Sequence, residues 1–64
     1  MDERFIVEWV SELGLKFNRR FHYNADALIF IYETMINLHP LIKSVCIIDR
    51  DDDSIQWFKK DKFQ

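Results

Sequence analysis

Gly14 and Pro40 are the only glycine and the only proline in this sequence of 64 residues. Glycine readily adopts a left-handed backbone, and the residue before a proline disfavours helical geometry, so both positions mark where a regular element ends. They divide the chain into three segments with different hydrophobic periods. These periods constrain the fold class more than any other feature of the sequence.

The segment before Gly14 fits an amphipathic helix over residues 2–13, in which Asp2 caps the start and Gly14 supplies the stop. At about 100° per residue, one side of this helix carries the larger apolar side chains, namely Phe5, Ile6, Trp9, Val10 and Leu13. The alternative is a fourth strand over Arg4 to Val10, which is rich in residues that favour strands. The fit to the helical period and the Gly14 stop favour the helix.

The middle segment predicts a strand followed by a helix. From Leu15 to Tyr23 apolar and polar residues alternate, with Arg19 as the exception, which is typical of a strand. Asn24 or Asp26 can then cap a helix that runs to about residue 38. Its apolar arc is broad and comprises Ala25, Ala27, Leu28, Ile29, Ile31, Tyr32, Met35, Ile36 and Leu38. We therefore expect this helix to be the most buried element.

The last segment predicts a hairpin, with strands over residues 44–49 and 55–60 and a polar turn over 50–54. The expected order is α-β-α-β-β within a single α+β domain spanning residues 1–64. A right-handed crossover makes the first two strands parallel, either adjacent or with the third strand between them. Both helices then cover one face of a three-stranded sheet.

Composition narrows the functional classes. Cys46 is the only cysteine, so no disulfide can form within the chain, which suits a reducing, cytoplasmic location. No apolar run approaches the length of a membrane span, and we expect a soluble protein without a membrane partner. A net charge of −2 argues against a surface tuned as a whole to nucleic acid.

Motifs for catalysis, cofactors and metals are absent from the sequence, so we predict a protein that is not an enzyme and has no cofactor. His22, His39 and Cys46 show no spacing that suggests nucleophilic catalysis. Asp49, Asp51 and Asp53 have the alternate spacing of a calcium loop. However, Ser54 stands where that loop needs glycine and Lys60 where it needs glutamate, so we predict a solvated turn and no metal site.

One candidate surface for a protein partner lies on the predicted helix over residues 24–38. Its narrow polar side carries Asp26, Glu33, Thr34 and Asn37, and Phe30 projects among them. We therefore expect Phe30 to be exposed and to anchor a partner together with Asp26, Glu33 and Asn37. The function this predicts is that of a small non-enzymatic regulator or inhibitor that occupies a surface of another protein. Accessory proteins of phages and mobile elements are similar in size, by analogy only.

Two alternatives remain open. The sheet face away from the helices is expected to be basic and to bind single-stranded nucleic acid through stacking and cationic contacts. The residues expected on it are Lys16, Arg20, His22, Phe58 and Lys60. The other alternative is a homo-oligomer, because a core this small gains from burying further surface between copies.

Overall fold

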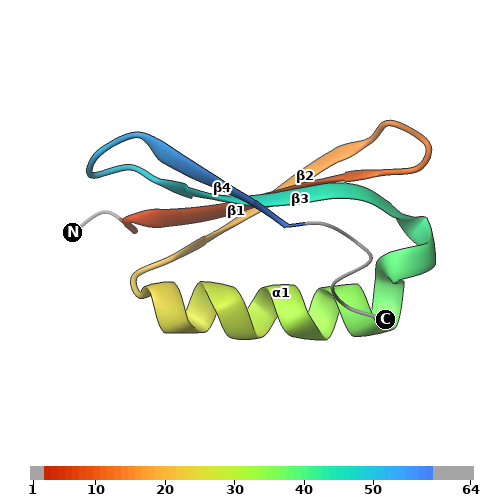
Figure 1. Ribbon diagram of the computed structural model, residues 1–64, viewed down its shortest axis with the longest axis horizontal. Helices are drawn as coiled ribbons and strands as arrows, with labels where there is room; N and C mark the ends of the chain where they lie inside the picture. The colour runs from red at the N-terminus through yellow and green to blue at the C-terminus, as the bar shows by residue number, and fades with distance from the viewer. Residues whose placement is uncertain (1–2, 59–64) are drawn as a thin grey trace.

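A four-stranded antiparallel sheet with one helix against one of its faces makes up the computed structural model (Figure 1). The structure describes residues 3–58, except for the side chains of residues 35–39. The strand order across the sheet is β2-β1-β3-β4. The elements are β1 (Phe5–Ser11), β2 (Lys16–Phe21), α1 (Asn24–Leu38), the short 3-10 helix η1 (His39–Leu41), β3 (Ile42–Asp49) and β4 (Ser54–Phe58).

The segment predicted as the first helix is a strand, β1, and the alternative of a fourth strand over Arg4 to Val10 is correct. β1 is a central strand that pairs with β2 on one side and with β3 on the other. Phe5, Val7 and Trp9 point toward α1, so the segment also fits a period of two. Pairing with two neighbouring strands provides hydrogen-bond partners for the backbone N–H and C=O groups on both sides of β1. This pairing outweighs the helical period of the side chains.

The remaining predicted elements are present with shifted ends. The α+β class is confirmed, but the sheet has four strands instead of three and is covered by one helix instead of two. β2 and β3 are parallel to each other, as expected, because each is antiparallel to β1. However, the strand between them is β1, which the sequence pattern had assigned to a helix. The predicted end of the last strand at residue 60 lies outside the described residues.

Gly14 lies in the turn that follows a strand, not at the end of a helix. Its φ of 86° lies in the left-handed region, and its N–H donates to the carbonyl oxygen of Ser11 at 2.9 Å in the turn between β1 and β2. The Ser11 N–H donates to the carbonyl oxygen of Leu15 at 2.9 Å and closes the hairpin. The local requirement for glycine was therefore recognised correctly, although the element before it was not.

A β-bulge in the pairing of β1 with β3 changes which side chains of β3 face the helix. Val10 pairs with Ser44 while the next residue, Ser11, pairs with Ile42, so Lys43 is an extra residue in β3. Because of this bulge, both Ile42 and Val45 face the helix, and both are buried. Lys43 remains exposed.

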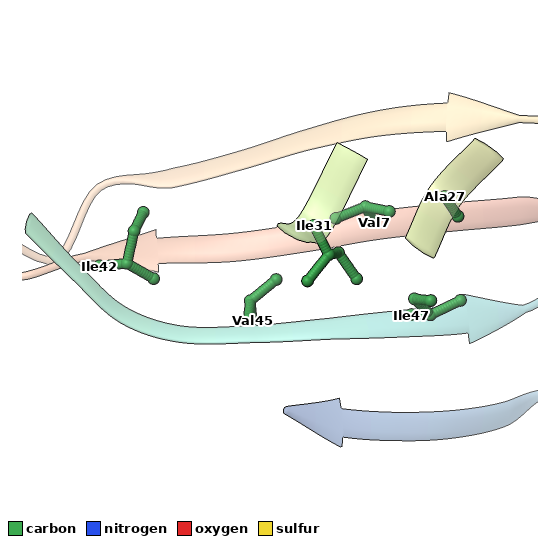
Figure 2. Packing of buried hydrophobic residues seen from close by; sticks show 6 residues of the cluster. All are labelled: Val7, Ala27, Ile31, Ile42, Val45 and Ile47. Carbon is green, nitrogen blue, oxygen red and sulfur yellow. The ribbon is translucent and has the colours of Figure 1, made fainter. Parts of the chain in front are cut away.

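The core lies between α1 and the two central strands. Figure 2 shows Ala27 and Ile31 of α1 directed at Val7 of β1 and at Val45 and Ile47 of β3. The cluster of buried side chains comprises Val7, Ala27, Ile31, Ile42, Val45 and Ile47.

The buried stripe of α1 differs from the predicted one. It follows Ala27, Ile31 and Thr34, and Thr34 is only 8% exposed although it was expected on the polar side. Ile29 and Tyr32, expected in the apolar arc, are 56% and 52% exposed. Because α1 carries apolar residues on nearly all sides, its period alone could not select the face that meets the sheet.

We predict that Ile31→Ala lowers the free energy of unfolding by about 2–5 kcal/mol, because it leaves a cavity at a fully buried position. Ile29→Ala is the matched control on the same helix and should change the free energy of unfolding by less than about 0.5 kcal/mol. Urea denaturation followed by circular dichroism measures both values. Equal losses in the two variants would contradict the observed orientation of α1.

Candidate binding surface on the open sheet face

The sheet face opposite α1 has no covering layer within the described residues (Figure 1). Residues that are directly opposite on paired strands point to the same side of a sheet, so the register places the side chains of this face in rows. We call it the open face. Its rows are Arg20, Ile6, Ile48 and Ile55; then Asn18, Glu8, Cys46 and Trp57; then Lys16, Val10 and Ser44.

Apolar side chains form a continuous area on this open face. Ile55 and Trp57 of β4 are 53% and 63% exposed, and Ile6 and Ile48 beside them are half-buried. An antiparallel sheet with one solvated face normally presents polar residues on that face. An apolar area on the outer face therefore marks a surface suited to contact with another molecule.

Charge is unevenly distributed over the open face. Lys16 and Arg20 lie at the β2 edge, whereas no residue of β4 from Ser54 to Phe58 is charged. Glu8 lies in the middle on β1, half-buried, and its carboxylate forms no ion pair with another residue in the range 3–58. The face thus changes from basic at one edge to apolar at the other, with one acidic group between them.

Cys46 lies next to Glu8 on the open face and is only 2% exposed. Burial raises the pKa of the Cys46 thiol, and the negative charge of Glu8 raises it further. The thiol is therefore held in its protonated form, which is a poor nucleophile. Its contribution to the open face is that of a small apolar side chain.

Phe30 is half-buried, so its predicted exposure is wrong. Its ring centroid lies 5.3 Å from that of Trp9 and 5.4 Å from that of Phe21. The guanidinium carbon of Arg19 lies 5.2 Å from the same centroid, within the range of a cation–π interaction. Two aromatic residues of the sheet therefore draw Phe30 into the interface between α1 and the sheet.

The structure does bring three of the predicted partner-binding residues together. Asp26, Phe30 and Glu33 line a shallow depression of about 350 Å³ beside β2. The other lining residues are Arg19, Phe21 and Ile29. Arg19 interrupted the predicted apolar side of its strand, and its position over the rings of Phe21 and Phe30 explains how that side accommodates a charge. The side chain of Asn37 lies outside the described residues.

The predicted nucleic-acid residues separate in the structure. Lys16 and Arg20 lie on the open face as expected, whereas His22 follows the end of β2, with its ring 6.4 Å from that of Tyr23. Phe58 points to the helix side and packs against the core, which corrects its predicted place. Lys60 lies outside the described residues.

The aromatic residue of β4 on the open face is Trp57, which the sequence pattern missed. The strand reads Ile55, Gln56, Trp57, Phe58, so either set of alternate residues contains an aromatic side chain. Only the pairing of Trp57 with Cys46 and of Phe58 with Val45 shows which one faces the helix.

The acidic turn between β3 and β4 uses its carboxylates to shape the turn. Asp49 accepts hydrogen bonds from the Arg4 guanidinium at 2.8 and 2.9 Å and from the backbone N–H of Asp51 at 3.0 Å. Asp52 accepts one from the backbone N–H of Ser54 at 2.9 Å. Within the described residues no three His, Cys, Asp or Glu side chains are placed to hold a metal ion.

Comparison with family models, curated proteins and solved structures finds no match to this chain. Within residues 3–58, no helix has both the length and the hydropathy needed to cross a membrane.

We predict that the Arg4–Asp49 pair stabilises the fold in a pH-dependent manner. The hydrogen bonds from Arg4 lower the pKa of Asp49 in the folded protein. The contribution of these hydrogen bonds to the free energy of unfolding is therefore fully present above the pKa of Asp49 in the unfolded protein, about 3.9. It is lost as the pH falls through the lower pKa of Asp49 in the folded protein. Asp49→Asn should thus reduce the free energy of unfolding at pH 6, and the difference from wild type should shrink toward pH 2. A difference that stays constant over this range would contradict the assignment.

Proposed function

We propose that this chain is a small non-enzymatic protein-binding module, a regulator or inhibitor that occupies a partner's surface through its open face. The observation that carries the proposal is the exposed pair Ile55 and Trp57, next to half-buried apolar side chains on an uncovered sheet. β1 and β3 are paired on both sides and hold the half-buried part of this surface in place, and β4 is paired with β3. A pre-formed surface loses less conformational entropy when a partner binds than a surface that must be ordered.

The exposed part of Trp57 is large enough to act as an anchor. Tryptophan is among the residues most enriched at energetically dominant interface positions. Removing the exposed 63% of this residue from water is worth at most about 3 kcal/mol, from which the entropic cost of association is subtracted. Ile55, on the same strand and face, adds to the same contact.

The charges of the open face define the chemistry of the partner. A complementary surface presents apolar side chains over β3 and β4, an acidic group opposite Lys16 and Arg20, and a basic group opposite Glu8. The ionic groups set the orientation, and the apolar area supplies most of the affinity. This combination favours a folded protein surface as the ligand.

The depression lined by Asp26, Phe30 and Glu33 carries less weight in the proposal. Phe30 is already packed against Trp9 and Phe21, so the part of it left for a partner is small.

We also place the protein in the cytoplasm, because its lone buried Cys46 suits a reducing compartment.

We predict that Ile55→Lys and Trp57→Lys each weaken capture of a protein partner from an extract of the source organism by about tenfold or more in Kd. Ile29→Lys is the matched control, since Ile29 is 56% exposed on α1 and Ile55 is 53% exposed on the open face. Quantitative pull-down with mass spectrometry identifies the partner, and titration of the purified partner gives the Kd. Circular dichroism confirms that the variants fold.

The two sets of variants distinguish the two surfaces. If Ile29→Lys abolishes capture while Ile55→Lys leaves it unchanged, the partner binds beside the depression lined by Asp26 and Glu33. The proposal for the open face is then wrong.

Single-stranded nucleic acid is the second candidate ligand of the open face. Lys16, Arg20 and Trp57 share this face, so cationic and stacking groups are present together. The basic residues are at the β2 edge and Trp57 is on β4, at the opposite edge of the sheet. A strand of nucleic acid would therefore have to cross the whole sheet to contact both.

If nucleic acid is the ligand, the affinity for a labelled single-stranded oligonucleotide should fall linearly with salt on logarithmic scales. The double variant Lys16→Gln, Arg20→Gln should reduce the slope of log affinity against log salt concentration by about 1.4. Each contact with a phosphate of a single strand contributes about 0.7 to this slope. Lys43→Gln, at the exposed bulge of β3, is the control and should leave the slope unchanged. The absence of binding at low salt would exclude this function.

A further inference from the structure

The two edges of the sheet differ in how they discourage pairing with another strand. β2 carries Lys16, Arg19 and Arg20, and charged side chains are a common protection of sheet edges. β4, at the opposite edge, contains no charged residue and presents Ile55 and Trp57 largely exposed. The β4 edge thus lacks the charged protection that the β2 edge has.

We propose that two copies of this chain pair through β4 in antiparallel orientation and form one continuous eight-stranded sheet. The acidic turn before the strand selects this orientation. Asp51, Asp52 and Asp53 directly precede β4. Antiparallel pairing keeps the acidic turns of the two copies at opposite ends of the paired strands, whereas parallel pairing sets them side by side.

The sequence of β4 is self-complementary in one register. Pairing centred on Gln56 sets Ile55 opposite the partner's Trp57 on the open face, and Trp57 opposite the partner's Ile55. Aromatic and β-branched residues directly opposite each other stabilise antiparallel strands. On the helix side, Gln56 lies opposite the partner's Gln56, on the two-fold axis.

Nothing in the described structure obstructs this pairing on the helix side. α1 packs over β1, β2 and β3 and leaves β4 at the margin, so two helices on the same side of the joined sheet remain apart. A two-fold axis perpendicular to the sheet also keeps both open faces on one side. The dimer therefore presents a single surface made of two open faces.

Among the possible pairings between two copies of this chain, β4 with β4 is the most favourable. Pairing of β2 with β2 would oppose Lys16, Arg19 and Arg20 with the same residues of the partner subunit. Pairing of β2 with β4 would be head to tail and would continue indefinitely. Pairing of β4 with β4 closes as a two-fold dimer and opposes no like charges within the strand, because both copies contribute their uncharged edge.

The expected dimer is weak, because five-residue strands bury less than the about 1,600 Å² of a standard interface. In sedimentation velocity between about 5 µM and 1 mM, the mass should rise from 7.9 kDa toward twice that value. A mass that stays at 7.9 kDa over the whole range overturns the proposal.

Charge reversal on the two-fold axis tests the register. Gln56→Glu and Gln56→Lys each place like charges opposite each other, about 5 Å apart, and should raise the dimer Kd about tenfold or more. An equimolar mixture of the two variants should form a heterodimer at least as stable as the wild-type dimer. Asn18→Lys, on the β2 edge, is the control and should leave the dimer unchanged. A dimer that tolerates both Gln56 variants, or a mixture that does not associate, overturns the proposal.

Dimerisation through β4 and capture of a protein partner by the open face can be tested separately. Gln56 lies on the helix side of β4, so its variants leave the open face intact and should still capture the protein partner. Loss of dimerisation with retained capture leaves the proposed function standing. A stable dimer without any captured partner leaves the inference standing and removes the proposed function.

Discussion

The backbone of β1 is hydrogen-bonded to β2 on one side and to β3 on the other, and the rest of the fold depends on this double pairing. It joins the hairpin formed by the first half of the chain to the hairpin formed by the second half. Val7, at its middle, is fully buried against α1. The Arg4–Asp49 ion pair fixes one end of β1 to the end of β3. Without β1 between them, β2 and β3 would have no partner in common.

A single helix cannot cover a four-stranded sheet on both faces. α1 lies over three strands on one side, which leaves the open face uncovered and β4 at the margin of the core, where Phe58 packs against it. The sequence places apolar residues in these uncovered positions, above all Ile55 and Trp57. Both proposals rest on this arrangement, because an uncovered apolar face suits a partner protein and an uncharged edge suits a second copy.

The candidate surface was only partly predictable. Alternation along β2 placed Lys16 and Arg20 on the outer face correctly, because polar and apolar residues there differ clearly. It failed for β4, where Trp57 and Phe58 are adjacent aromatic residues, and the wrong one was placed outside. The helical projection failed for Phe30, because the aromatic rings that hold it belong to strands distant in the sequence.

The sequence by itself determined the features that depend on neighbouring residues. These are the left-handed turn at Gly14, the aspartate-rich turn before β4, the end of α1 before Pro40, and the α+β class. The tertiary structure alone decided that the first segment is a strand, which side of α1 is buried, and which side of β4 faces out. The physical reason is that these segments carry apolar residues on more than one side, so the hydrophobic period alone selects neither the type of element nor the side that is buried. Only backbone pairing and side-chain packing between distant segments can then select one of them.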